Sequence, residues 1–314
     1  MQLRKWVQRS ALALAIGVLA ACSSTTHPTE LATLGKNVSD AVMEQQLELA
    51  GPVALETVVS ANWAVPLSGL VNLKDPQAAG LKDHDEPIKV FAHVLRHPTY
   101  GNFLVDTGVS ARLAQDPSSV GLNWLVQKAM KLDQMKMAQS TADIVAGLPG
   151  PLAGVFFTHL HIDHISGMPD IDAKVPLFVG THESTGKQAI QVFTQGATNA
   201  LLEGKSPLQE WQFAMRPQPL GQDSFEAVLD IFGDGSVYAI YTPGHTDGST
   251  AYLVRSTQGP VLLVGDTSHT QWGWDHGVEP GDFTRDPVRN RTNLRKLKAL
   301  VARHPNIQVR LGHQ

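Results

Sequence analysis

Cysteine is almost absent from this sequence, which holds a single one, Cys22, among 314 residues. The chain can form no internal disulfide, and metal clusters built on several thiolates are excluded. Positive charge is not in excess either, because 25 lysines and arginines stand against 29 aspartates and glutamates. Proteins that bind nucleic acid need a basic surface for phosphate contacts. We therefore expect no nucleic-acid partner.

The sequence also lacks the motifs of two enzyme classes. The sequence has no G-x-S-x-G elbow for a nucleophilic serine. Asp106-Thr107-Gly108 looks like half of an aspartic protease site, but the second copy does not occur. Neither motif therefore indicates a function for this chain.

The N-terminus combines positive charge with a short apolar run. The run, Ala11–Ala21, is too short to span a bilayer. It follows the basic residues Arg4, Lys5 and Arg9, an order typical of a secretory signal. We predict that residues 1–21 are a signal peptide.

The run ends in the sequence LAAC, which resembles the bacterial lipobox and places Cys22 at the lipidated position. The alternative is a standard signal peptide with an incidental cysteine. Ser23 at the next position favours sorting to the outer membrane. We expect a lipid-anchored protein of the bacterial cell envelope, on the periplasmic side, with residues 22–50 forming a lipidated tether and a short N-terminal helix.

Residues 51–314 are predicted to form one domain, because no repeat or low-complexity linker interrupts them. Strands are expected at Leu55–Ala64, Ile88–Arg96, Asn102–Asp106, Gly154–Thr158, Val175–Val179, Phe225–Phe232, Val237–Tyr241, Thr250–Arg255, Pro260–Gly265 and Ile307–Leu311. Helices are expected at Asn37–Ala50, Gly121–Ala138, Thr141–Gly147, Glu183–Thr194 and Pro287–Arg303. Strands at both ends with helices between them indicate an α/β protein with two sheets between helical layers.

A dense group of polar residues follows the apolar run Val155–Phe157. His159, His161, Asp163 and His164 fall within six residues. In an extended segment His159 and His161 project to the same face, and Asp163 and His164 follow where the chain turns. Imidazole and carboxylate are both normal zinc ligands. The group can therefore supply ligands to two neighbouring metal ions.

Three further candidate ligands stand at the ends of predicted strands. His245 follows Val237–Tyr241 in a turn rich in glycine and proline, Asp266 follows a buried run, and His313 follows Ile307–Leu311. Strands that each deliver one such residue are expected to build a site at one edge of a sheet.

The segments HLHIDH, TPGHTDGS, VGD and GH occur in this order, and together they resemble the metallo-β-lactamase fold superfamily over roughly residues 85–314. The resemblance implies an αββα sandwich, in which two mixed sheets pack face to face with helices outside. It also implies a dinuclear site whose ligands are divided between two metals: His159, His161 and His245 for one, Asp163, His164 and His313 for the other, and Asp266 bridging both. Zinc is the expected divalent metal, with iron, manganese and cobalt as alternatives.

Within the superfamily, the ligand set is most similar to that of N-acyl homoserine lactone lactonases and related lipoprotein hydrolases. The resemblance implies that a metal-bridging hydroxide attacks the carbonyl of a small lactone or ester, with Asp163 moving the proton. Quorum quenching would be one role of such an enzyme. The alternatives are a β-lactamase, a thioesterase, a phosphoesterase or a non-catalytic metal-binding lipoprotein.

One position departs from the lactonase pattern. The lactonases usually carry a tyrosine three residues after the bridging aspartate, where this chain has His269. His269 is therefore predicted to donate the hydrogen bond to the substrate, or to indicate another substrate.

The predicted helix 121–138 is rich in soft apolar side chains and is a candidate lid over an acyl chain. The alternative is an amphipathic helix packed on the core. The residues predicted to line the substrate pocket are Trp124, Met130, Met135, Trp272 and Trp274.

Overall fold

The computed structural model describes residues 23–188, 191–216 and 223–314. The predicted signal peptide, 1–21, and the predicted lipidation site, Cys22, lie outside these residues. Within the described ranges, no helix has both the length and the apolar character needed to cross a membrane.

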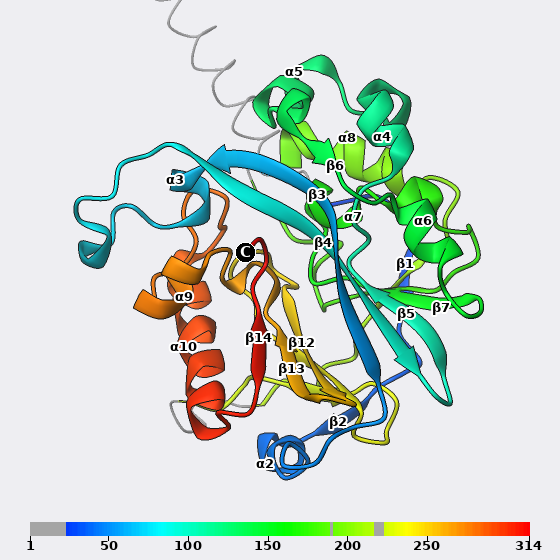
Figure 1. Cartoon of the computed structure of the whole chain (residues 1–314), viewed down its shortest axis with the longest axis vertical. Coiled ribbons are helices and arrows are strands. Elements are labelled where there is room, and N and C mark those ends of the chain that lie inside the picture. Colours follow the sequence, from blue (N-terminus) through cyan, green and yellow to red (C-terminus); the bar gives the residue numbers. More distant parts are fainter. Residues whose placement is uncertain (1–22, 189–190, 217–222) are drawn as a thin grey trace, which may run out of the picture.

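Two mixed sheets form the centre of the described chain (Figure 1). The eight-stranded sheet has the order β1-β9-β8-β7-β5-β4-β3-β6, and the six-stranded sheet has the order β14-β13-β12-β11-β10-β2. The bounds are β1 Thr29–Leu31, β2 Lys36–Val38, β3 Ala54–Pro66, β4 Asp85–His97, β5 Gly101–Val105, β6 Lys136–Met137, β7 Leu152–Phe156, β8 Leu177–Val179, β9 Leu208–Glu210, β10 Val228–Asp230, β11 Val237–Tyr241, β12 Thr250–Ser256, β13 Gly259–Leu263 and β14 Gln308–Arg310.

Helices lie outside the two sheets, α4, α5, α6 and α8 beside the first and α9 and α10 beside the second (Figure 1). The α-helices are α2 Asp40–Glu44, α3 Leu67–Leu70, α4 Ala111–Gln115, α5 Trp124–Ala129, α6 Thr141–Ala146, α7 Ile162–Ile165, α8 Gln191–Leu202, α9 Gln271–His276 and α10 Pro287–Arg303. Short 3₁₀ turns are η1 Pro76–Ala78, η2 Pro117–Val120, η3 Leu132–Gln134, η4 Met168–Asp170 and η5 Gly265–Thr267.

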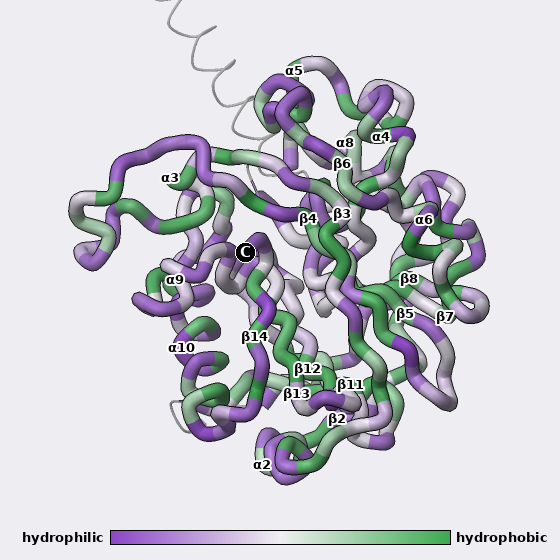
Figure 2. Tube along the Cα trace, viewed as in Figure 1, coloured by the Kyte–Doolittle hydropathy of each residue, from purple (hydrophilic) through white to green (hydrophobic). Residues whose placement is uncertain are grey.

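Three hydrophobic clusters correspond to the three interfaces of this αββα sandwich. Strand β11 contributes to two of these clusters, because successive side chains of a strand point to opposite faces. Val237, Ala239 and Tyr241 pack in the cluster between the sheets, whereas Tyr238 and Ile240 pack with leucines of α10. Figure 2 shows hydrophobic residues concentrated along the central strands and hydrophilic residues over the outer turns. The predicted fold class is confirmed.

The prediction for α10 is confirmed at both ends. Its first residue is Pro287, and the side chain of Asp286 caps it by accepting the N–H of Arg289, as expected for a helix start. Leu294, Leu297 and Leu300 form its buried stripe.

The predicted tether over residues 23–36 and the helix from Asn37 are wrong in part. Thr29–Leu31 is β1, parallel to β9, and Lys36–Val38 is β2, antiparallel to β10. The helix is confined to Asp40–Glu44. Both sheets offer an edge strand with unpaired backbone groups, and this segment satisfies them.

Two other predicted helices are shorter than expected. The predicted helix over 121–138 ends at Ala129, because Lys131 adopts a positive φ of 52° and its carbonyl oxygen accepts the indole N–H of Trp63. Lys136–Met137 then pairs with β3. The region predicted as a helix from Glu183 forms a turn up to Thr185 and irregular structure up to Gln188, and α8 is helical from Gln191.

Phe156 occupies the centre of the interface between the sheets. Its ring stacks on Phe103 with 4.9 Å between ring centroids and lies 5.8 Å from Tyr252. We predict that Phe156→Ala lowers the free energy of unfolding by about 3–5 kcal/mol, because it leaves a cavity in a closely packed core. Urea denaturation measures the change.

Phe193→Ala is the control, since this ring on α8 is 64% exposed. It should change the free energy of unfolding by less than about 0.5 kcal/mol. Equal losses in the two variants would contradict the placement of the core.

Candidate metal centre

The histidine-rich segment leaves the eight-stranded sheet at the end of β7, in the middle of that sheet. The backbone carbonyl of Thr158 accepts the N–H of Thr250 from the other sheet at 2.9 Å. His161 is the N-cap of the short helix α7, which carries Asp163 and His164. The rings of His159 and His161 lie 4.5 Å apart, on the same side of the segment as predicted.

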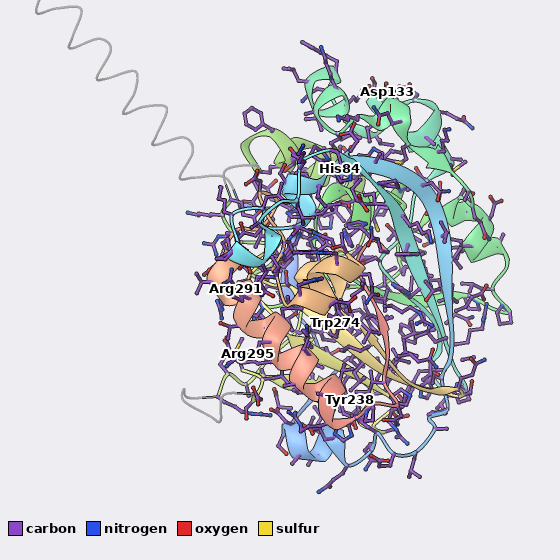
Figure 3. The ribbon with its side chains drawn as sticks, turned by 60° about the vertical axis from the view of Figure 1, so that its left-hand side comes forward. His84, Asp133, Tyr238, Trp274, Arg291 and Arg295 are labelled. Carbon is purple, nitrogen blue, oxygen red and sulfur yellow. The ribbon has the colours of Figure 1, made fainter. Side chains whose placement is uncertain are left out.

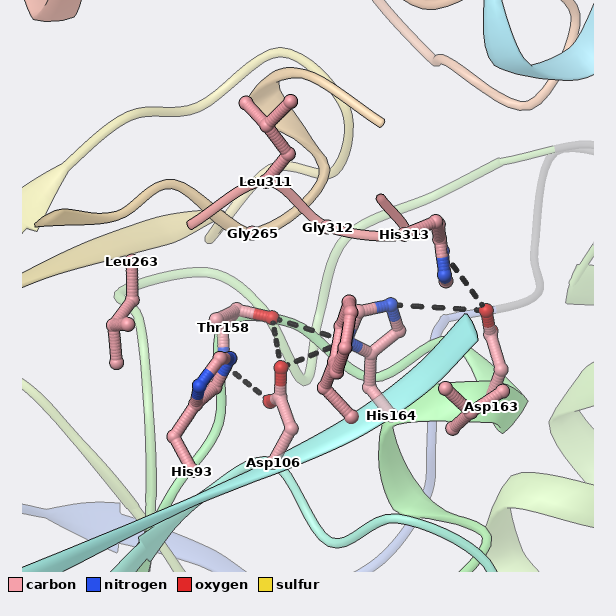
Figure 4. A pocket seen from close by; sticks show the side chains of 12 residues that line it. His93, Asp106, Thr158, Asp163, His164, Leu263, Gly265, Leu311, Gly312 and His313 are labelled. Atoms are coloured by element: carbon pink, nitrogen blue, oxygen red, sulfur yellow. Dashed lines mark hydrogen bonds and ion pairs between the residues drawn. The ribbon is translucent and has the colours of Figure 1, made fainter. Parts of the chain in front are cut away.

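All seven predicted ligand residues meet in one place. His245 arrives after β11, Asp266 after β13 and His313 after β14. Figure 4 shows His164, Asp163 and His313 facing one another beneath Gly312. Within each of two groups, the ligand atoms all lie within 4.8 Å of one another. The first group is His159, His161, His245 and Asp266, and the second is Asp163, His164, Asp266 and His313.

Asp266 belongs to both groups and lies at their centre. Its Oδ2 is 2.9 Å from the Nε2 of His269 and 3.3 Å from the Nε2 of His164. The Nε2 atoms of three more histidines lie 3.4–3.6 Å away, those of His245, His313 and His159. The carboxylate is therefore surrounded by five imidazole rings.

Several of these polar atoms are buried and unsatisfied within the described part of the chain. His159 Nε2, His164 Nε2 and Asp266 Oδ1 have no hydrogen-bond partner there. A buried polar atom without a partner costs about 1–3 kcal/mol. Imidazole nitrogens and carboxylate oxygens are common ligands of divalent metals. The residues thus fit a pair of such ions.

The other nitrogen of most of these rings is held by a second group, which fixes the direction in which the ring faces. His164 Nδ1 pairs with Asp106 Oδ2 at 2.8 Å. The Nδ1 atom of His313 lies 2.8 Å from the carbonyl oxygen of Lys89. That of His245 lies 3.2 Å from Thr284 Oγ1.

Asp106, in the D-T-G segment, supports the histidine-rich segment from behind. Its carboxylate accepts the N–H and the O–H of Thr158, both at 2.8 Å, in addition to its bond with His164 (Figure 4). Asp106 has a positive φ of 54°, an uncommon conformation for a residue with a side chain. The strand end is therefore shaped to place this carboxylate behind the histidine loop.

The electrostatic environment divides the histidines into two sets. Burial lowers the pKa values of His159, His161 and His245 below their usual range, so these rings are neutral at pH 7. Burial opposes protonation of His164 too, but the carboxylates of Asp266, Asp106 and Asp163 raise its pKa well above the usual range. Neutral imidazole is the form that binds a metal.

A cavity of about 560 Å³ opens onto the two groups. His161, Asp163, His245, Asp266, His269 and His313 form its inner end. Its outer walls include apolar side chains, notably Trp63, Leu70, Ile88, Ile162 and Phe283.

Of the five predicted pocket residues, only Met130 lines this cavity. Trp124, the first residue of α5, is 69% exposed. Met135 and Trp272 pack against the outer core of the first sheet. Trp274 packs with the core beneath α10 (Figure 3). The predictions for these four residues are wrong.

Comparison with known proteins agrees with this geometry. A sequence model of the metallo-beta-lactamase superfamily matches residues 86–313. The N-acyl homoserine lactonase AttM of Azorhizobium caulinodans is 29% identical over 250 residues, which cover 77% of this chain and 87% of AttM.

Two solved structures are similar in fold. A quorum-quenching N-acyl homoserine lactone lactonase superposes with a TM-score of 0.60 at 19% identity, covering 84% of this chain and 94% of its own. AidC, a dizinc quorum-quenching lactonase in complex with a product, gives a TM-score of 0.53 at 13% identity, covering 90% of this chain and 92% of its own.

The order of the ligand residues, their convergence in space and the similarities in sequence and fold agree. They confirm the prediction of a metal-dependent hydrolase. This chain belongs to the metallo-beta-lactamase superfamily.

Proposed function

We propose that this protein is a dinuclear metal hydrolase that opens the ring of a small lactone, with N-acyl homoserine lactones as the leading substrates. The observation that carries the proposal is the pair of His/Asp groups that share Asp266 at the inner end of a cavity with apolar walls. The relative AttM is named an N-acyl homoserine lactonase, which supports the choice of substrate.

His159, His161 and His245 would hold one ion, Asp163, His164 and His313 the other, and Asp266 would contact both. When bound, two divalent ions at this place would lower the pKa of a water molecule so that it could act as a nucleophile at neutral pH, and would polarise the substrate carbonyl. Zinc is the proposed metal, because the structural neighbour AidC is described as dizinc. Elemental analysis distinguishes it from iron, manganese and cobalt.

Asp163 is proposed to transfer the proton of the reaction. It lines the cavity, and its Oδ2 lies 3.3 Å from His313 Nε2. Its side chain keeps 17% exposure, more than that of Asp266. Water adds to the carbonyl carbon, the ring C–O bond breaks, and the leaving oxygen takes up the proton that Asp163 removed from the water. The product is a hydroxy acid.

The cavity supports a substrate with one polar and one apolar end. The carbonyl end of a lactone would lie against the His/Asp groups, and an acyl chain would lie along Trp63, Ile162 and Phe283. Burial of apolar surface stabilises such a chain by about 25 cal/mol per Å². The alternatives, a β-lactam, thioester or phosphoester, are distinguished by a substrate panel.

Removal of the shared carboxylate of Asp266 tests the dinuclear site. Purified full-length chain should contain about two metal ions and hydrolyse a lactone within a panel of an acyl homoserine lactone, a γ-lactone, nitrocefin, a thioester and a phosphodiester. Asp266→Ala should lose bound metal and reduce kcat/KM by at least about 10³-fold, because one carboxylate serves both ions.

Asp143→Ala is the control, since this exposed residue of α6 belongs to neither ligand group and does not line the cavity. It should keep both metal and turnover. Turnover of another panel member alone would replace the substrate, and full activity in Asp266→Ala would refute the dinuclear site.

His269 is proposed to hold Asp266 in place and to face the substrate. It lies on the cavity wall, with Nδ1 at 3.2 Å from the carbonyl oxygen of Leu70 and Nε2 at 2.9 Å from Asp266 Oδ2. Its two ring nitrogens are thus both engaged. This arrangement favours a role through Asp266 over a direct copy of the tyrosine found in lactonases.

His269→Phe should therefore lower kcat by about 10–100-fold, since a supporting hydrogen bond is lost next to the reacting groups. Steady-state kinetics with metal analysis measures the effect. If His269 instead acts by donating a hydrogen bond to the substrate, His269→Tyr should recover part of kcat. Unchanged kinetics in His269→Phe would exclude both roles.

We also propose that the chain is lipidated at Cys22 and attached to the periplasmic side of the cell envelope, most simply at the outer membrane. The support is the sequence of residues 1–23 alone. Metabolic labelling with a radioactive fatty acid in a bacterial host should label the wild type, and Cys22→Ala should abolish the label. Labelling of neither, with release of soluble protein, would contradict the anchor.

A further inference from the structure

A buried carboxylate outside the ligand set contacts both the loop that carries His159 and His161 and the loop that carries His245. Glu183 is only 1% exposed. Its Oε1 accepts the backbone N–H of Leu160 at 2.7 Å. Its Oε2 accepts the hydroxyl of Thr246 at 2.6 Å and the N–H of Gly248 at 3.0 Å. All three partners are neutral donors.

Two of these donors are direct neighbours of the histidines in the sequence. Leu160 stands between His159 and His161, and Thr246 directly follows His245. The first loop leaves β7 of one sheet and the second leaves β11 of the other. One carboxylate therefore joins the two sheets next to all three histidines of the group, and His161 Nδ1 and His245 Nε2 lie 2.9 Å apart.

The segment that carries Glu183 packs directly against the loop of His245. A Cβ on Gly248 would lie 2.5 Å from the Cβ of Glu183, and one on Gly180 would lie 1.8 Å from the carbonyl oxygen of Gly248. Both distances are far shorter than any real contact. The two glycines thus let the backbone of residues 180–183 approach the loop of His245 closely enough for the Glu183 carboxylate to reach it.

Gln188 adds a second, parallel connection a few residues later in the same segment. Its Nε2 donates to the carbonyl oxygen of His245 at 2.8 Å, and its Oε1 lies 3.4 Å from His161 Nε2. The sequence predicted a helix over both residues, but Glu183 lies in a turn and Gln188 in irregular structure.

We propose that Glu183 is a positioning residue that holds His159, His161 and His245 in the geometry needed to bind one of the two metal ions. The inference rests on the proposed function, because it takes this group to be a metal site. Burial raises the pKa of Glu183 above its usual range, so the carboxylate is costly to retain. A group that orients ligands without touching the ion typically contributes a factor of about 10–100 to metal affinity.

The isosteric variant Glu183→Gln tests this directly. A carboxylate accepts through both oxygens, whereas an amide has one accepting oxygen and an NH₂ group that can only donate. In the variant, the NH₂ group must face the N–H of either Leu160 or Gly248. That loop should move away, although the side chain keeps its volume.

Glu279→Gln is the matched control. Glu279 is also 1% exposed, but its carboxylate binds Arg291 and Asn72, away from the ligand loops. Metal-free full-length protein would be titrated with Zn²⁺ against a chromophoric chelator. Glu183→Gln should weaken one of the two zinc-binding steps by about 10–100-fold and leave the other within about threefold. Glu279→Gln should leave both steps unchanged even if its melting temperature falls.

Unchanged zinc affinities in Glu183→Gln, or equal losses in the two variants, would overturn the inference while leaving the metal site intact. If Glu183→Gln does not fold, Thr246→Val removes one donor with little change in volume. It should weaken the same step less, and an unchanged step would overturn the inference. Absence of zinc binding in the wild type would overturn the proposed function together with this inference.

Discussion

The carboxylate of Asp266 is buried among five imidazole rings, and the placement of the surrounding elements depends on keeping it there. Burial alone would raise its pKa, but His269, His164 and His313 hold that pKa well below its usual range. A charge in this position needs compensation from groups fixed in advance. The sandwich provides them, because strands of both sheets end at one edge and deliver their ligand residues together.

Much of this arrangement could be predicted from the sequence, because it depends on local order along the chain. His159, His161, Asp163 and His164 follow an apolar strand directly, and each distant ligand follows another strand. Helix α10 carries its own start signal, Asp286-Pro287, and its own apolar stripe. Such features need no knowledge of tertiary contacts.

The remaining features could not be predicted, because they depend on contacts between distant segments. Lys131 ends α5 where its carbonyl oxygen accepts the indole N–H of Trp63 of β3, so the predicted lid helix is short. The polar segment Thr29–Val38 has no strong strand pattern and becomes ordered by pairing with sheet edges. The sequence predicts a helix from Glu183, because the contacts of its carboxylate with Leu160 and Thr246 come from distant segments.

The most direct test of the central claim is a crystal structure of the full-length protein grown with zinc, with data measured above and below the zinc absorption edge. The account predicts two anomalous peaks per chain, each about 2.0–2.2 Å from a carboxylate oxygen of Asp266. The first should be ringed by His159, His161 and His245, the second by Asp163, His164 and His313. A single peak, or peaks that do not contact Asp266, would contradict a shared dinuclear site.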